Sequence, residues 1–229
     1  MNRSITLTFD NGPTVAVTPT VLDVLARQNV LATFFVLGQN LQSKETRALV
    51  QRAAEEGHWI GNHTYTHAVP LGVTTEPEAS EQEIGRTQKL IGSHAHPDKL
   101  FRPFGGGGKI GPHLLSREAF EFLKSGGYTC VLWNSIPHDW DDPEGWAETS
   151  LRHARQLSWT LAVLHDYETG AMRNLESYIE NARSEGFTFR QEFPPDCVPM
   201  VRGTVALPMD AFISNPTTIQ TPQETQHAN

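Results

Sequence analysis

Hydrophobic and polar positions along the chain switch repeatedly between the period of a strand and the period of a helix. Residues 4–9 alternate apolar and polar side chains, as a β-strand does, and the apolar positions after Thr18 follow the spacing of an amphipathic helix. Residues 32–37 form a nearly continuous apolar run, which is typical of a strand covered on both faces. The predicted strands are residues 4–9, 32–37, 58–62, 129–133, 160–164 and 187–189, and the predicted helices begin at Thr18 and cover residues 44–56, 76–91, 114–124, 144–156 and 175–184.

This alternation indicates βαβ units, whose right-handed crossovers place the ends of parallel strands on one rim of the sheet. With 229 residues, 38% of them hydrophobic, the chain can bury one large core, and single α/β barrels commonly have this length. We therefore expect a single α/β domain. Prolines accumulate after residue 190, and few apolar residues follow Ile213, so residues 191–229 are expected to be a Pro-rich C-terminal segment that ends in a poorly packed polar tail.

Charge and hydropathy argue against two classes of partner. The formal net charge is −8 and the Lys and Arg residues do not cluster, whereas a nucleic-acid surface must neutralise phosphates. No apolar run approaches the ~20 residues of a membrane span, and the N-terminus leads into a predicted strand without a signal peptide. We expect no nucleic-acid or membrane partner and a cytoplasmic location. Cys130 and Cys197 lack the spacing of metal ligands and are interpreted as structural thiols.

Residues capable of chemistry follow several predicted strands. Asp10 and Asn11 end the first strand, where a parallel barrel presents its active site, although a plain turn that caps the strand explains them equally well. His63 and His67 follow the third strand at the spacing of one helical turn, so that both rings could face one metal ion, but such pairs also occur on solvated helix faces. His165 follows the apolar run 160–164. Together these positions predict a functional site on one rim.

Four consecutive glycines, residues 105–108, follow Arg102, Pro103 and Phe104. Glycine permits close approach of the backbone to a ligand, and successive free N–H groups can form an anion-binding concavity. Lys109 is not followed by Ser or Thr, so the tract does not match a phosphate-binding loop. A flexible surface loop and a role as backbone donor both remain open.

Short segments spread over most of the chain occur in a familiar order and at familiar spacings. They are residues 8–13 (TFDNGP), 32–36 (ATFFV), 57–67 (GHWIGNHTYTH), Arg102-Pro103, Trp133 with Asp139-Trp140, and residues 161–165 (LAVLH). In these segments the chain resembles the NodB-like polysaccharide deacetylases, carbohydrate esterase family four. The resemblance covers residues 5–189, so residues 1–190 are assigned to this domain, and it implies an irregular (β/α) barrel with seven or eight strands.

The resemblance implies a metal-dependent hydrolase that removes the acetyl group from an N-acetylglucosamine-type saccharide. His63 and His67 would bind a divalent metal ion, with zinc expected, and Asn11 stands where most members have a metal-binding Asp. Asp10 would be the general base that takes a proton from the attacking water, and protonated His165 would give a proton to the leaving amine. By the same resemblance, Arg102 would hold Asp10 ionised and Asp139 would keep His165 protonated. The backbone N–H of Gly105 would face the oxyanion. Trp140 and Leu164 would contact the substrate.

Two departures from the family pattern affect these expectations. Asn11 is a neutral oxygen ligand, so we expect weaker metal binding and a more electrophilic ion than with Asp. Phe104-Gly105-Gly106 stands where the family usually has Pro-Tyr-Gly, and the missing aromatic wall is expected to open the cleft or to leave it flexible. The second departure concerns the substrate more than the reaction.

Three functions are compatible with the sequence. The first is deacetylation of an N-acetylated saccharide, for which a cytoplasmic chitooligosaccharide is the expected substrate. The second is opening of a cyclic amide, because relatives on this fold resemble allantoinase-type hydrolases. The third is saccharide binding without catalysis, although a pure binding protein gains nothing from a general acid such as His165. The sequence does not define the oligomeric state.

Overall fold

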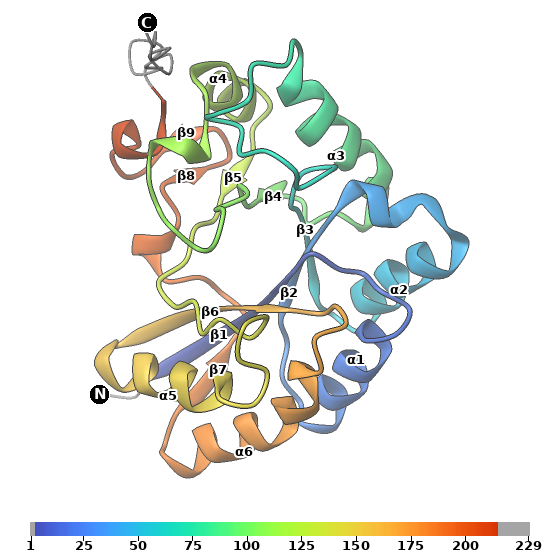
Figure 1. Ribbon diagram of the computed structural model, residues 1–229, viewed down its shortest axis with the longest axis vertical. Coiled ribbons are helices and arrows are strands. Elements are labelled where there is room, and N and C mark those ends of the chain that lie inside the picture. The colour runs from blue at the N-terminus through green and yellow to red at the C-terminus, as the bar shows by residue number, and fades with distance from the viewer. Residues whose placement is uncertain (1–2, 215–229) are drawn as a thin grey trace, which may run out of the picture.

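One curled sheet with helices around its outside makes up residues 3–214, the part of the chain that the computed structural model describes (Figure 1). The strands are β1 (Ser4–Asp10), β2 (Thr33–Val36), β3 (Trp59–Asn62), β4 (Leu100–Phe101), β5 (Thr129–Cys130), β6 (Trp159–His165), β7 (Thr188–Arg190), β8 (Met200–Val201) and β9 (Thr204–Val205). The α-helices are α1 (Thr18–Arg27), α2 (Lys44–Glu55), α3 (Arg86–Ile91), α4 (Arg117–Ser125), α5 (Trp146–Gln156) and α6 (Leu175–Ser184).

The strand order shows how the sheet curls into an irregular barrel. Neighbouring strands follow the order β6-β1-β2-β3-β4-β5-β8-β9, and β7 also pairs with β1. Strands β1 to β7 pair with one another only in parallel, whereas β8 pairs antiparallel with β5 and β9 pairs antiparallel with β8. An isolated parallel bridge between Ser135 and Ala162 joins the segment after β5 to β6, which brings the sheet back to its first edge. The seven parallel strands confirm the predicted α/β barrel.

Strand β1 is buried along its whole length and has a different environment on each face. Ile5, Leu7 and Phe9 pack in a core cluster that includes residues of α1 and α6. On the other face the Thr8 hydroxyl donates a hydrogen bond to the carbonyl oxygen of Ala162 at 2.8 Å. The polar positions of this strand therefore face the inside of the barrel rather than solvent, where a buried hydroxyl needs a hydrogen-bond partner.

Several predicted elements are shorter than expected. The helix predicted from residue 76 begins at residue 79, because Pro77 disfavours helical backbone at the residue before it, and it passes through a π-helical turn, Glu81–Gly85, into α3. The helix predicted from residue 114 begins after Ser116, whose hydroxyl accepts the Ala119 N–H at 3.0 Å and caps α4. The strand predicted at residues 129–133 is limited to Thr129–Cys130.

Residues after 190 continue to pack on the barrel. Strand β8 pairs with β5 at Met200 and Cys130, and Ile213 forms a bridge with Leu115. Cys130 and Cys197 are free and buried, and burial raises the pKa of each thiol to about 12, as expected of inert structural thiols. The predicted polar tail beyond residue 214 lies outside the described residues.

Within residues 3–214 there is no helix with the length and apolar character needed to span a membrane. The cytoplasmic location stays a prediction.

Candidate active site

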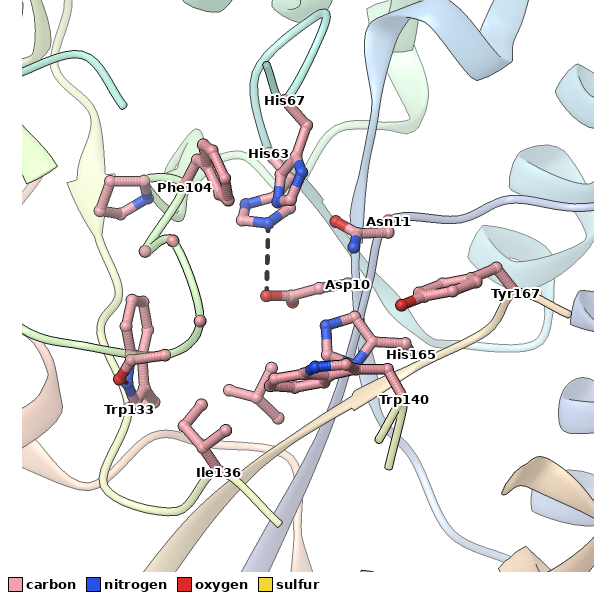
Figure 2. Close-up of a pocket in the computed structure, with 16 residues that line it drawn as sticks. Asp10, Asn11, His63, His67, Phe104, Trp133, Ile136, Trp140, His165 and Tyr167 are labelled. Atoms are coloured by element: carbon pink, nitrogen blue, oxygen red, sulfur yellow. Dashed lines mark hydrogen bonds and ion pairs between the residues drawn. The ribbon is translucent and has the colours of Figure 1, made fainter. Parts of the chain in front are cut away.

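A pocket lies where the carboxyl ends of the parallel strands meet, and side chains from several strand ends face it (Figure 2). The register of β1 and β6 aligns Asp10 with His165, and β3 leads directly into His63. The site predicted on one rim is therefore present. The pocket is lined by Asp10, Asn11, His63, His67, Pro103, Phe104, Gly105, Gly106, Gly107, Gly108, Trp133, Ile136, Trp140, Val163, His165 and Tyr167.

Asp10 and Arg102 form a fully buried ion pair at the base of the pocket. The Arg102 guanidinium donates to Asp10 Oδ1 at 2.8 Å and to the Thr8 hydroxyl at 2.7 Å, and it lies 4.1 Å from the centre of the Phe35 ring. Burial by itself raises the pKa of Asp10, but the charge of Arg102, followed by those of His63 and His165, outweighs it and holds this pKa below its ordinary value. Asp10 is thus available as a base at neutral pH.

His63 is oriented by a backbone hydrogen bond. Its Nδ1 lies 2.8 Å from the carbonyl oxygen of Arg102, and because a carbonyl can only accept, Nδ1 carries the proton. Burial lowers the pKa of His63, so the ring is neutral and Nε2 has a free lone pair. This nitrogen faces Asp10 Oδ2 at 3.5 Å (Figure 2). Two acceptors face each other there without a proton between them, which is an arrangement that a cation stabilises.

His67 joins His63 through a loop, and the helical turn suggested by the spacing is not formed. Thr64 and His67 both have left-handed backbone conformations. The loop is held in place by Glu83, whose carboxylate accepts the N–H groups of Tyr65 and Thr66, both at 2.8 Å. The His63 and His67 ring centres nevertheless lie 4.9 Å apart, so the two imidazoles come together as predicted.

Asn11 completes a set of donors that suits a divalent cation. Its Oδ1 is buried and has no hydrogen-bond partner among residues 3–214. Burial, followed by the charge of His63, lowers the pKa of His67 to about 3, so this imidazole is also neutral and able to act as a ligand. No group of three or more His, Cys, Asp or Glu side chains in the described residues is arranged to hold a metal. The fit therefore depends on an amide oxygen as the third ligand.

His165 lies on the side of Asp10 away from His63 (Figure 2), and its surroundings favour the protonated form of the ring. Its Nδ1 and its backbone N–H are bound to the two carboxylate oxygens of Asp139, at 2.8 and 2.9 Å. Burial lowers the pKa of His165, but the hydrogen bond and charge of Asp139, followed by the charge of Asp10, outweigh it and raise this pKa above 6.5. Because Nδ1 is engaged by Asp139, Nε2 is the nitrogen that can exchange a proton with a ligand. The predicted partnership of Asp139 with His165 is present.

The three predicted substrate contacts have different outcomes. Gly105 and Trp140 line the pocket, and the Trp140 ring meets His165 edge to face with centres 4.9 Å apart. Leu164 does not line it. Successive side chains of β6 point to opposite faces, so Leu164 packs in the helix-side core and Val163 faces the pocket instead.

The expectation that an aromatic wall is missing is wrong. Phe104 lines the pocket and packs on His67 with ring centres 3.8 Å apart. Trp133 forms a further part of the wall, and its indole N–H donates to the carbonyl oxygen of Gly108 at 3.0 Å. A Cβ on Gly105 would lie 2.6 Å from the Trp133 ring, so glycine at this position permits the contact between loop and indole.

A second buried carboxyl group, that of Asp166, packs against the turn that follows β1. The Thr18 hydroxyl donates to Asp166 Oδ2 at 2.5 Å, and burial raises the pKa of Asp166 to about 6. The carboxyl lies so close to Gly12 that a side chain at residue 12 would collide with it. This contact secures the backbone that presents Asp10 and Asn11 to the pocket.

Tyr167 and Ile136 are pocket residues that the sequence interpretation did not include. Both follow segments that had been singled out, Ile136 after Trp133 and Tyr167 after His165. Residues just beyond a strand end commonly contribute to a barrel active site. Their position after a predicted strand is therefore the feature of the sequence by which both residues could have been found.

Comparisons with known proteins agree with this geometry. The polysaccharide deacetylase family matches residues 1–131. A peptidoglycan-N-acetylglucosamine deacetylase from Listeria monocytogenes is 30% identical over 190 residues, which cover 82% of this chain and 38% of the relative. A chitooligosaccharide deacetylase from Rhizobium leguminosarum bv. trifolii is 38% identical over 167 residues, 72% of each chain.

A solved structure shares the fold as well. The family 4 acetyl xylan esterase from Clostridium thermocellum, in complex with a cobalt ion, superposes with a TM-score of 0.67 at 28% identity and covers 82% of this chain and 88% of its own. The family match includes the first strand, the His pair and the Arg102 segment, all of which contribute to the pocket. On this agreement of sequence, fold and site, the chain belongs to the polysaccharide deacetylase family.

Proposed function

We propose that this protein is a metal-dependent deacetylase that removes the N-acetyl group from an N-acetylglucosamine-containing oligosaccharide or polysaccharide. Two buried hydrogen-bonded pairs, Arg102 with Asp10 and Asp139 with His165, support this most directly. Asp10 and His165 line the same pocket. The two pairs hold a base ionised and an acid protonated side by side, which amide hydrolysis requires. The activities for which the Listeria and Rhizobium relatives are named support a saccharide as the substrate.

The positions of Asp10 and His165 define the proton transfers in this proposal. Asp10 accepts a proton from the water that attacks the acetyl carbonyl carbon. His165 donates its Nε2 proton to the amide nitrogen as the C–N bond breaks, so that the products are acetate and a free amine. Arg102 keeps Asp10 ionised through the first step, and Asp139 stabilises the imidazolium until the second. The backbone N–H of Gly105, in the pocket wall, is proposed to face the oxyanion.

The cation would be held by Asn11 Oδ1, His63 Nε2 and the imidazole of His67. When bound, a divalent ion such as zinc supplies Lewis acidity and lowers the pKa of water. The cobalt ion in the complex of the Clostridium esterase supports this part of the proposal. The neutral imidazoles and the unpartnered amide oxygen are the features of this chain that fit it.

Replacing Asn11 by Asp should tighten zinc binding. The carboxylate adds one negative charge to a ligand set that is otherwise neutral, so we expect the dissociation constant, measured by calorimetry, to fall about tenfold or more. Asn181→Asp adds the same charge on the exposed face of α6 and should leave the constant unchanged. Zinc affinity that stays the same or decreases in Asn11→Asp would contradict the assignment of Asn11.

The pH dependence of kcat/KM should reflect the shifted pKa values of Asp10 and His165. Because the pKa of Asp10 lies below its ordinary 3.8, the base stays ionised above about pH 4, and we expect no loss of activity from its protonation in that range. Because the pKa of His165 lies above 6.5, activity should persist at neutral pH and fall as pH rises through this raised value. Asp139→Asn should move that alkaline limb to lower pH, and a limb that does not move would exclude His165 as the acid.

The function itself is tested by acetate release from chitooligosaccharides and peptidoglycan fragments by the zinc-loaded protein. Acetate release supports the proposal. Turnover of cyclic amides without acetate would favour the allantoinase-type alternative, and saccharide binding without turnover would favour a non-catalytic relative.

A further inference from the structure

Tyr167 presents an unused hydroxyl group to the pocket. It follows His165 by two residues, beyond the end of β6, and its side chain is half-buried. Figure 2 shows the phenol oxygen directed into the pocket, between Asn11 and His165. None of the steps proposed above uses this group.

The hydroxyl has no hydrogen-bond partner within residues 3–214, unlike two other tyrosines. The Tyr178 hydroxyl pairs with that of Ser150 at 2.8 Å, and Tyr65 accepts a hydrogen bond from Gln42 at 2.9 Å. The hydroxyl of a tyrosine that is withdrawn from solvent usually has a hydrogen-bond partner, and in a half-buried tyrosine that faces a pocket a ligand can supply it. Burial, and then the charges of Asp139 and Asp141, raise the pKa of Tyr167, so the group stays protonated and can donate.

The ring of Tyr167 also packs against His165, the proposed acid. It packs edge to face against His165, with ring centres 5.5 Å apart and planes inclined by 73°, and Trp140 contacts His165 in a similar way. A substrate nitrogen that receives the His165 proton would therefore lie on the side of the pocket that Tyr167 lines. In an N-acetylated amino sugar, the carbon that carries this nitrogen is flanked by ring carbons that carry oxygen.

We propose that the Tyr167 hydroxyl donates a hydrogen bond to an oxygen on a ring carbon next to the one that bears the N-acetyl group. Tyr167 is then a substrate-binding residue that favours amino sugars over amides without such an oxygen. This inference rests on the proposed deacetylase function and extends it to the recognition of the sugar ring.

Tyr167→Phe tests the inference because it removes only the hydroxyl. We expect kcat/KM for acetate release from a chitooligosaccharide to fall about tenfold, since the sugar oxygen loses its donor. The fall should be clearly smaller with 4-nitroacetanilide, whose amide is not attached to a sugar. Tyr178→Phe is the matched control, because it removes a buried hydroxyl far from the pocket, and it should change neither rate by more than twofold.

Binding provides a second readout that does not depend on turnover. The dissociation constant of the deacetylated oligosaccharide, measured by calorimetry, should rise about tenfold in Tyr167→Phe and stay unchanged in Tyr178→Phe. Equal losses on both substrates, or unchanged saccharide kinetics and binding, would overturn the inference. If the unaltered protein releases no acetate from any N-acetylated saccharide, the proposed function fails instead, and the two failures are distinguishable.

Discussion

Asp10→Asn is expected to reduce acetate release from chitooligosaccharides about 1,000-fold, within the range typical of a lost general base. The amide keeps the shape of the carboxylate and can still accept the Arg102 hydrogen bond, but it cannot take a proton from water. Zinc binding should be retained, because the proposed ligands are Asn11, His63 and His67. The measurement is the initial rate of acetate release by the zinc-loaded variant, with zinc content determined on the same sample.

Asp23→Asn is a suitable control for this change. Asp23 forms an exposed ion pair with Arg52 at 2.6 Å, and its neutralisation should leave the rate unaltered. If Asp10→Asn retains full activity with metal bound, Asp10 is not the base. If zinc is lost together with activity, Asp10 contributes to the metal site rather than to proton transfer.

Arg102→Met is expected to have the largest effect on stability. Arg102 is completely buried, and its guanidinium also donates to the carbonyl oxygen of Leu132 at 3.3 Å. Methionine approximately fills the volume of the stem but leaves the Asp10 carboxylate buried without its partner. Breaking a buried ion pair in this way costs about 3–5 kcal/mol in the free energy of unfolding, measured by urea denaturation at pH 7.

The pH dependence of this loss has a definite sign. Because Arg102 lowers the pKa of folded Asp10, its contribution is present above the ordinary carboxyl pKa and is lost as pH falls through the lowered one. The difference between Arg102→Met and the unaltered protein should therefore decrease below about pH 4. Arg155→Met, at an exposed pair with Glu148 and Glu185, should cost much less, because solvent screens surface charges. Similar losses in both variants would show that the buried pair is not special.

The site residues at strand ends were predictable because reactive side chains stand immediately after apolar runs in the sequence. Asp10 and His165 each terminate a run, and parallel pairing then aligns them without further information. Arg102 and Asp139 were assigned by resemblance alone, since they follow no distinctive hydrophobic pattern. Their hydrogen bonds to Asp10 and His165 depend on contacts between segments far apart in sequence.

The parts that could not be predicted depend on which face a side chain occupies and on the path of loops. Leu164 was assigned to the pocket, but the phase of β6 sends Val163 there instead. The loss of a family tyrosine suggested an open cleft, whereas Phe104 folds back onto His67. Tyr167 was missed because nothing in a linear pattern shows that the chain beyond β6 turns its phenol into the pocket.

Metal removal followed by replacement shows whether hydrolysis depends on a cation held by Asn11, His63 and His67. Acetate release from a chitooligosaccharide is followed after chelation and during titration with zinc. We predict that the chelated protein loses its activity and that one equivalent of zinc restores it, but not in His67→Ala. Turnover that is the same before and after chelation would contradict the account.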